Sequence, residues 1–257
     1  MWRVLTKDYK DLDGNSTNKA LLLAEKILTG GIRYYVNSTQ RKITKETVIG
    51  TETVTVHANN WQYSTIRAWL NGRYESDDSQ AKEYAGKGFL QTAFTQSARD
   101  LIVDTSVDNS ASSTNPASNP KQWKNGENPY ASDTPTTDKV FLLSEKEATT
   151  GAHLEDKDKD KDITENYGFD EYYKYVGDGT TLTSTRIRVT TDYAKATGAY
   201  QSSTEVYGGW WWLRSPGYYG EGHACVIDID GLADDYIHDD VDDSDGGVVP
   251  ALSISLQ

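Results

Sequence analysis

The feature that most constrains the fold is the aromatic run Trp210-Trp211-Trp212, which continues as Leu213-Arg214-Ser215-Pro216-Gly217. On a strand, consecutive side chains point to opposite faces, and tryptophan buries a large area, so we expect a strand with one face in the core. Arg214 would then need a carboxylate or carbonyl partner, because an unpaired buried charge is costly. The alternative that Trp211 and its neighbours form the floor of a binding site stays open.

The chain after Gly217 differs in charge from the chain before it. The 257 residues carry a net charge of −13, and ten acids lie after Gly217, where there is no Lys, Arg or Asn. Nucleic acids and anionic membrane surfaces attract cationic proteins, so we expect neither as a partner. No apolar run approaches the roughly 20 residues of a membrane span, so we expect no membrane insertion.

Cysteine content and the amino terminus say little about the compartment. Cys225 is the only cysteine, which excludes an internal disulfide and a cysteine-paired metal site. Residues 2–5 already have the pattern of a strand, so no signal peptide is visible. We expect a cell-surface or secreted protein if a leader was removed, and a cytoplasmic one otherwise. The oligomeric state is left open.

Hydrophobic spacing predicts a single α+β domain over residues 1–257 with small antiparallel sheets and a few helices. Ser64 and Gly72 have the types of a helix cap and a helix stop, and Asp230-Gly231 is typical of a hairpin turn. Helical patterns precede a mainly stranded carboxy-terminal part, and 104–137 is a long irregular segment. We expect helices at 64–72, 89–103 with a break near Thr95, 144–147 and 191–197, and strands at 2–5, 20–28 (or a short helix), 139–143, 210–213, 224–229 and 248–256.

Motifs for catalysis and cofactor binding are absent from the sequence. There is no nucleophile elbow, P-loop or dinucleotide fingerprint, and Cys225 has no obvious base beside it. The run 156–162 alternates Asp and Lys but lacks the Gly and Glu of a calcium loop, so we interpret it as a solvated segment. The histidines, at 57, 153, 223 and 238, show no metal-ligand spacing. We therefore expect no enzymatic activity, no cofactor and no metal.

Two sets of residues interleave towards the carboxy terminus. One set looks like scaffold, and the other mixes Tyr, Asp, His and small polar residues, which is the chemistry of a binding surface with rigid aromatic contacts and adaptable polar ones. We expect the scaffold to include Trp210, Trp211, Trp212, Arg214, Gly247 and Pro250. We expect ligand binding by variable residues within about 218–246, namely Tyr218, Tyr219, Glu221, His223, Cys225, Ile227, Asp228, Asp234, Asp235, Tyr236, His238, Asp239, Asp240, Asp242, Asp243, Ser244 and Asp245.

Six ordered motifs spread over nearly the whole chain resemble a bacterial family of uncharacterised domains. They are W-R-V-L, I-R-A-W-L-N, T-D-K-V-F-L-L-S, T-D-Y-A-K-A, W-W-L-R-S-P-G and G-V-R-P-A-L, here residues 2–5, 66–71, 137–144, 191–196, 211–217 and 247–252. Val249 stands where the last motif has Arg, so any ion pair of that Arg is missing here.

The carboxy-terminal organisation of that family is similar to the variable proteins of diversity-generating retroelements. The resemblance implies a C-type-lectin fold and a mutable surface that binds a ligand. Mutagenesis of Asn codons at adenines cannot produce Lys, Gln, Glu, Met or Trp. Those types make up 44 of the first 217 residues but one, Glu221, of the 29 residues from 218 to 246. This bias favours diversification of the segment.

We therefore expect a variable protein that binds an unknown protein or glycan ligand, of basic character because the surface is acidic. Two alternatives remain. One is a calcium-assisted carbohydrate lectin, since the same fold serves lectins, although the Glu-Pro-Asn and Trp-Asn-Asp motifs are missing. The other is an oxidase similar to the formylglycine-generating enzymes, whose chemistry depends on cysteine.

Overall fold

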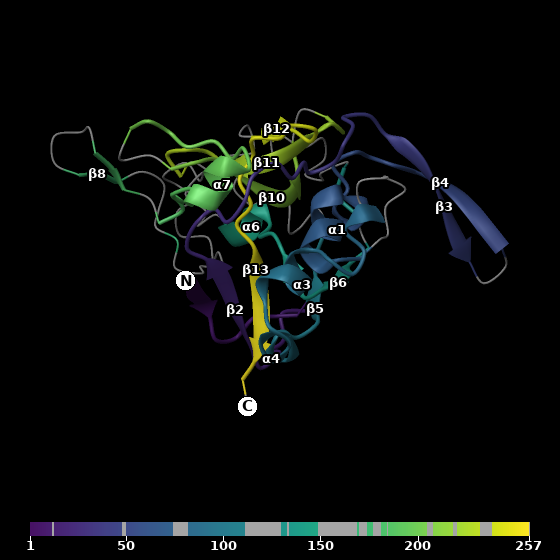
Figure 1. The fold of residues 1–257 in the computed structure, drawn as a ribbon. Helices are drawn as coiled ribbons and strands as arrows, with labels where there is room; N and C mark the ends of the chain where they lie inside the picture. Colours follow the sequence, from purple (N-terminus) through teal and green to yellow (C-terminus); the bar gives the residue numbers. More distant parts are fainter. Residues whose placement is uncertain are drawn as a thin grey trace, which may run out of the picture.

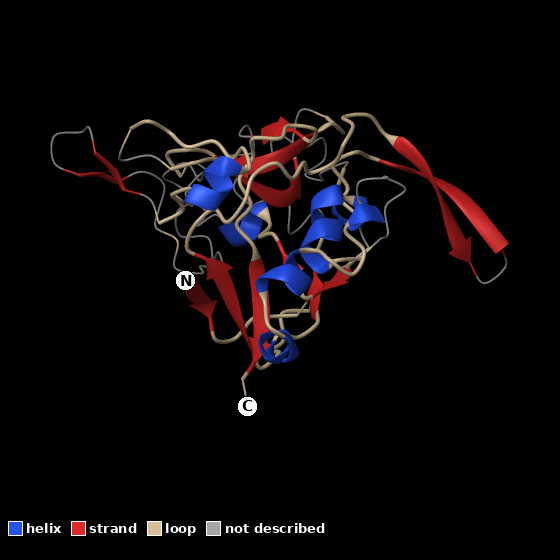
Figure 2. Ribbon diagram, viewed as in Figure 1, coloured by secondary structure: helices blue, strands red, loops and turns tan. Residues whose placement is uncertain are grey.

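A computed structural model describes residues 1–11, 13–47, 50–73, 82–110, 130–132, 134–148, 169, 174–176, 181–183, 185–204, 208–217, 220–231 and 238–256. The protein is α+β, with small antiparallel sheets and a few short helices (Figures 1 and 2). The fold class expected from the sequence is confirmed at this level. The run 156–162 lies outside the described residues.

The elements have the following bounds. The strands are β1 (Trp2–Thr6), β2 (Lys19–Ala24), β3 (Arg41–Thr47), β4 (Gly50–Val56), β5 (Thr105–Val107), β6 (Thr136–Asp138), β7 (Val140–Phe141), β8 (Lys174–Val176), β9 (Thr181–Thr183), β10 (Trp211–Pro216), β11 (His223–Ile227), β12 (His238–Asp240) and β13 (Ala251–Ser255). The helices are α1 (Thr65–Asn71), α3 (Phe89–Ala93), α4 (Gln96–Leu101), α6 (Glu145–Ala148) and α7 (Asp192–Ala196), with a turn of 3₁₀ helix, η1 (Trp61–Tyr63).

The four-stranded sheet has the order β1-β2-β13-β7, and its described pairs are antiparallel. Leu22 pairs with Leu252, so segments far apart in the sequence lie side by side, as Figure 1 shows for β2 and β13. β2 pairs with β1 on one side and with β13 on the other, which explains why an apolar run that could have been a helix is a strand, and Leu21 and Leu23 are fully buried there. The expected order of helices before strands is therefore incomplete, because β1 and β2 open the chain and join the closing strand.

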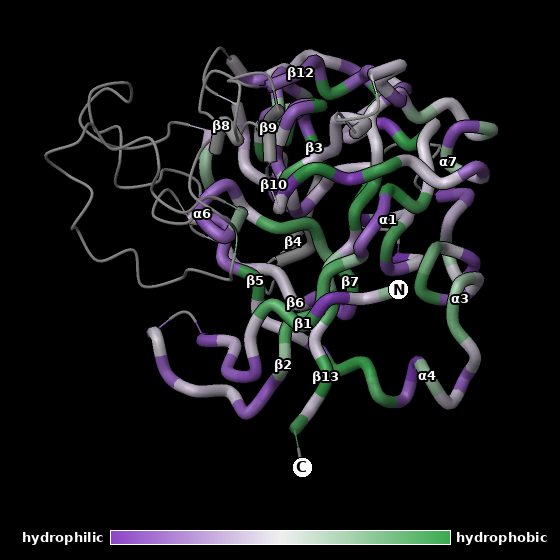
Figure 3. The backbone as a smooth tube through the Cα atoms, turned by 90° about the vertical axis from the view of Figure 1, so that its left-hand side faces the viewer, coloured by the Kyte–Doolittle hydropathy of each residue, from purple (hydrophilic) through white to green (hydrophobic). Residues whose placement is uncertain are grey.

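A second sheet, of order β10-β11-β12, carries the tryptophan run. Trp211 pairs with Ile227 and Trp212 pairs with Val226. Every residue of β10 is buried, so both faces of this strand lie in the interior, whereas one buried face was expected. Hydrophilic positions gather around β12 at one end of the molecule (Figure 3).

The helix ends follow the sequence signals. The Ser64 hydroxyl accepts a hydrogen bond from the Arg67 amide at 3.2 Å, and Gly72 ends α1 with φ of 60°, a conformation that favours glycine. The stripe at 89–103 breaks as expected, and Thr95 caps α4 by accepting from the Ala98 amide. Asn71 at the end of α1 donates to the Val140 carbonyl at 2.8 Å, which fastens the helix to β7.

The described part of the segment expected to be irregular, 104–137, contains a short strand pairing. Residues 105–107 form β5 and pair antiparallel with β6 at its other end. The described part of the hairpin β3–β4 projects from the body of the molecule (Figure 2). At its base Ile43, Val56 and Tyr63 form a small hydrophobic cluster separate from the main core.

Candidate functional site

The strand β10 is the scaffold of the carboxy-terminal region. Trp211 and Trp212 have no exposed surface, and the rings of Trp210 and Trp212 meet edge to face at 4.9 Å. Gly247 lies against this run, where an added Cβ would come within 2.8 Å of the Trp210 carbonyl oxygen. Only a residue without a side chain allows this approach, so Gly247 lets its segment pack against the strand. The burial of the tryptophans places them in the core. Pro250, also buried, accepts a backbone hydrogen bond from Ala24.

Arg214 is the buried strut that the sequence predicted, and Glu147 of α6 is its carboxylate partner. Its guanidinium also donates to the carbonyls of Leu142 at 2.8 Å and Asp108 at 3.0 Å. Burial on its own raises the pKa of Glu147, but the charge of Arg214 and hydrogen bonds from Ser144 and Tyr9 bring the pKa below its usual range. The pair therefore stays charged inside the protein and ties β10 to α6.

The carboxy-terminal surface, as we use the term, is the set of described candidate residues that are at least partly exposed. Ten of the seventeen candidates meet this description, and they lie on β11, on β12 and on the loops beside them. They are Glu221, His223, Asp228, His238, Asp239, Asp240, Asp242, Asp243, Ser244 and Asp245.

Two candidates do not belong to this surface. Cys225 is 1% exposed and Ile227 is fully buried, and both belong to the main hydrophobic cluster. The Cys225 thiol lies 3.5 Å from the Pro216 carbonyl, inside the sheet. Their expected role as exposed contact residues is therefore wrong, because β11 buries the positions that follow His223 against β10. The candidates Tyr218, Tyr219, Asp234, Asp235 and Tyr236 lie outside the described residues.

Histidines and carboxylates pair along the surface. His223 Nε2 lies 3.1 Å from Asp240 Oδ1, across the register pair that joins β11 to β12. The His223 and His238 rings meet edge to face at 4.9 Å. His57, which follows β4, lies 2.9 Å from Glu221 Oε2. The arrangement offers imidazole and carboxylate groups to a ligand, each held by a neighbour.

The loop after β12 crowds several carboxylates together. Partial burial, together with a hydrogen bond to Asp243 and the charges of Asp243 and Asp245, raises the pKa of Asp239 to about 7. Burial and the charge of Asp243 also raise the pKa of Asp245. At neutral pH the carboxylates of this loop therefore repel one another, and a bound cationic group would reduce that repulsion.

Asn59 supports the surface from behind, and sequence reasoning missed it. Its Nδ2 donates to the Gly220 carbonyl at 3.0 Å and to the His223 carbonyl at 2.9 Å, while its backbone amide donates to Glu221. The dipeptide Asn59-Asn60 is typical of an ordinary turn. No local pattern shows that it meets a loop some 160 residues away.

The described residues lend the two alternatives no supporting geometry. Among them, no three His, Cys, Asp or Glu side chains come together in a way that could hold a metal ion. Cys225, the residue that an oxidase would need, is enclosed by the sheet. None of the helices in this part of the chain is both long and apolar enough to cross a bilayer.

Comparison with known proteins gives one match. A family model described as a domain of unknown function, DUF6273, matches residues 17–256. No curated protein and no solved structure matches the chain.

Proposed function

We propose that this chain, which belongs to the DUF6273 family, is a ligand-binding protein whose carboxy-terminal surface binds a cationic protein ligand. The observation that carries the proposal is the sharp change in exposure across the three-stranded sheet. Every residue of β10 is buried, whereas β12, two strands away, and the loop after it present partly or fully exposed acids and His238. A rigid support for exposed polar groups lowers the ordering cost of binding.

The charge of the surface selects the ligand class. Seven of its ten residues are acidic, six aspartates and Glu221. Cationic side chains complement such a surface and accelerate association at low salt. A lysine- or arginine-rich face of a partner protein would thus bind at the carboxy-terminal surface.

The proposal extends to the origin of the surface. We place the chain with the variable proteins of diversity-generating retroelements and with the C-type-lectin fold, on the strength of the motif order and of the amino-acid bias after residue 217. Only the exposed positions are available for diversification in this proposal, because Cys225 and Ile227 lie in the core. A reverse transcriptase and a near-copy of the 3′ coding end differing at adenines should lie beside the gene, and a genome without them contradicts this part.

The binding proposal is tested with matched charge variants. Asp240, Asp242 and Asp245 are changed together to Asn, and the control changes the exposed Asp13, Asp100 and Asp192 to Asn, so that both proteins lose the same charge. Each is titrated by calorimetry with an acetylated peptide that alternates lysine and glycine. The surface variant should lose binding while the control keeps it. Equal losses would show non-specific attraction and would overturn the proposal.

A further inference from the structure

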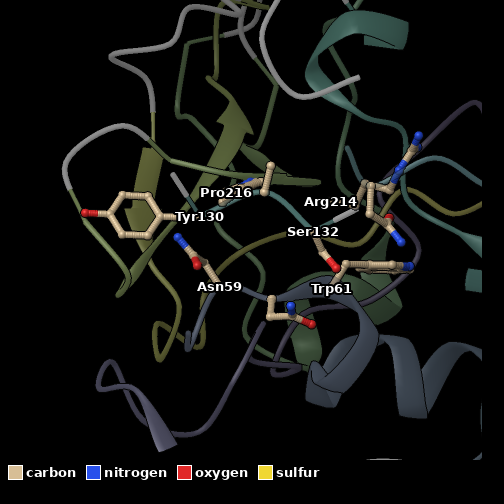
Figure 4. A pocket seen from close by; sticks show the side chains of 9 residues that line it. Asn59, Trp61, Tyr130, Ser132, Arg214 and Pro216 are labelled. Carbon is tan, nitrogen blue, oxygen red and sulfur yellow. The ribbon is translucent and has the colours of Figure 1, made fainter. Parts of the chain in front are cut away.

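A small open cleft lies between the segment 59–61, the segment 130–132 and the end of β10. Asn59, Asn60, Trp61, Asn109, Tyr130 and Arg214 are among its lining residues, and Figure 4 shows how segments far apart in the sequence converge on it. The room inside it, about 10 Å³ for the centre of a water-sized group, is close to the lower limit for one water molecule, so the cleft suits only the tip of one side chain or a group of that size. None of its lining residues belongs to the carboxy-terminal surface.

Three side-chain oxygens at this cleft have no hydrogen-bond partner. They are the amide oxygens of Asn59, Asn60 and Asn109, all buried from solvent. Asn59 is fully buried and Asn109 is 5% exposed. A buried polar group without a partner costs about 1–3 kcal/mol, so three at one place point to a ligand that supplies donors.

The orientation of two of these amides follows from their neighbours. The Asn59 nitrogen faces the carbonyls of Gly220 and His223, and the Asn109 nitrogen lies 3.2 Å from the Thr134 carbonyl. Carbonyl oxygens only accept hydrogen bonds, so a flipped amide would place oxygen against oxygen. The unpaired atoms of Asn59 and Asn109 are therefore oxygens by chemistry, and they are acceptors.

Two large donors along the cleft wall, at Trp61 and Arg214, already have acceptors. The Trp61 indole nitrogen donates to Asp138 at 3.1 Å. The Arg214 guanidinium donates to backbone carbonyls and to Glu147, whose charge balances its own. The lining thus combines engaged donors with unpaired acceptors, and it has no uncompensated positive charge to repel a cation.

We propose that this cleft binds a primary ammonium group, as carried by a lysine side chain or a small free amine. An ammonium group is a compact charge that carries only donors, so it suits a small cleft whose unpaired groups are acceptors. The planar fork of a guanidinium matches carboxylate pairs instead. A net charge of −13 attracts cations to the molecule as a whole.

The test is a titration of the full chain with methylammonium chloride, followed through the side-chain amide signals of asparagine in two-dimensional ¹⁵N NMR. The signals of Asn59, Asn60 and Asn109 should shift and saturate. Tetramethylammonium has the same charge but no N–H donor and should leave them unchanged. Equal shifts with tetramethylammonium or with potassium chloride, or a high-resolution structure with a resident water only and no saturation by amine, would overturn the proposal.

Asn60→Ala is the most informative variant. The Asn60 side chain makes no capping hydrogen bond to η1, so its loss should leave the fold intact. A hydrogen bond to a charged group contributes about 1.5–3 kcal/mol, so methylammonium should bind about tenfold more weakly or worse. Asn37→Ala, at an exposed asparagine, is the matched control and should bind as the natural chain does. Unchanged affinity in Asn60→Ala would contradict the site.

Two further arms separate the sources of the amine and the two proposals. If acetyl-Gly-Lys-Gly-amide binds more tightly than methylammonium, the source is a lysine of a polypeptide, and if only methylammonium binds, it is a free amine. The variant with Asn at 240, 242 and 245 should retain methylammonium binding. The cleft and the carboxy-terminal surface can therefore fail separately.

Discussion

The interior around β10 and the carboxy-terminal surface both gather charged groups, but they stabilise them differently. Inside, Arg214 and Glu147 form a pair whose remaining hydrogen bonds are with backbone carbonyls, the Ser144 amide and Tyr9. On the surface, Asp239, Asp243 and Asp245 lie together without a cation among their described contacts. Paired buried charge ties elements together, whereas crowded carboxylates are stabilised only when a proton or a ligand arrives.

The change with the largest expected effect removes the negative charge of the Arg214–Glu147 pair. Glu147→Gln leaves Arg214 buried with no counter-charge, which typically costs about 3–5 kcal/mol. The free energy of unfolding, measured in urea, should fall by that amount. The double change Arg214→Met with Glu147→Gln should be less destabilising than Glu147→Gln alone, and a more severe loss would contradict the view of the pair as a balanced unit.

The second prediction compares a buried position on β11 with an exposed position on its hydrogen-bonded neighbour, β12. Cys225→Asn places an amide in the core without a partner and should cost about 1–3 kcal/mol of stability. Asp240→Asn, at an exposed position across the same strand pair, should change stability by less than about 0.5 kcal/mol. Thermal unfolding of both variants checks this, and a tolerant Cys225 position would show that β11 is less enclosed than the structure indicates.

The third and smallest effect concerns pH. Because the pKa of Asp239 is raised from 3.8 to about 7, the folded protein binds this proton more tightly than the unfolded chain does. The contribution of Asp239 to stability is thus complete below about pH 4 and is lost as the pH rises to about 7. Asp239→Asn should be more stable than the natural chain at pH 8, by about 1 kcal/mol or less since solvent screens a half-exposed group.

The same titration should act on binding if the carboxy-terminal surface takes a cation. Acidification from pH 8 to pH 6 protonates Asp239 and lowers the negative charge of the surface, so the lysine–glycine peptide should bind more weakly. The dependence should flatten in Asp239→Asn. An unchanged slope in that variant would assign the effect to another group.

Local signals in the sequence predicted local structure well. Ser64, Gly72 and Thr95 mark helix ends through their own backbone or hydroxyl chemistry, and the structure places them there. The need of Arg214 for a carboxylate was also predictable, since burial of its neighbours required it. Which carboxylate it meets was not, because Glu147 precedes it by 67 residues.

The site was harder to predict than the fold because composition does not reveal which way a side chain points. Cys225 and Ile227 matched the chemistry of variable positions, yet tertiary packing encloses them. Asn59, Asn60 and Asn109 gave no signal at all. They become a candidate site only in the folded chain, where separate segments meet at one cleft and leave amide oxygens without donors.

The pairing of Leu22 with Leu252 also has a consequence for synthesis on the ribosome. β2 emerges more than two hundred residues before β13, the strand that separates it from β7, so the sheet stays open through most of translation. Open strand edges invite association with other chains. A product cut short before residue 251 would keep that vulnerability permanently, which makes it a natural target for chaperones and proteases.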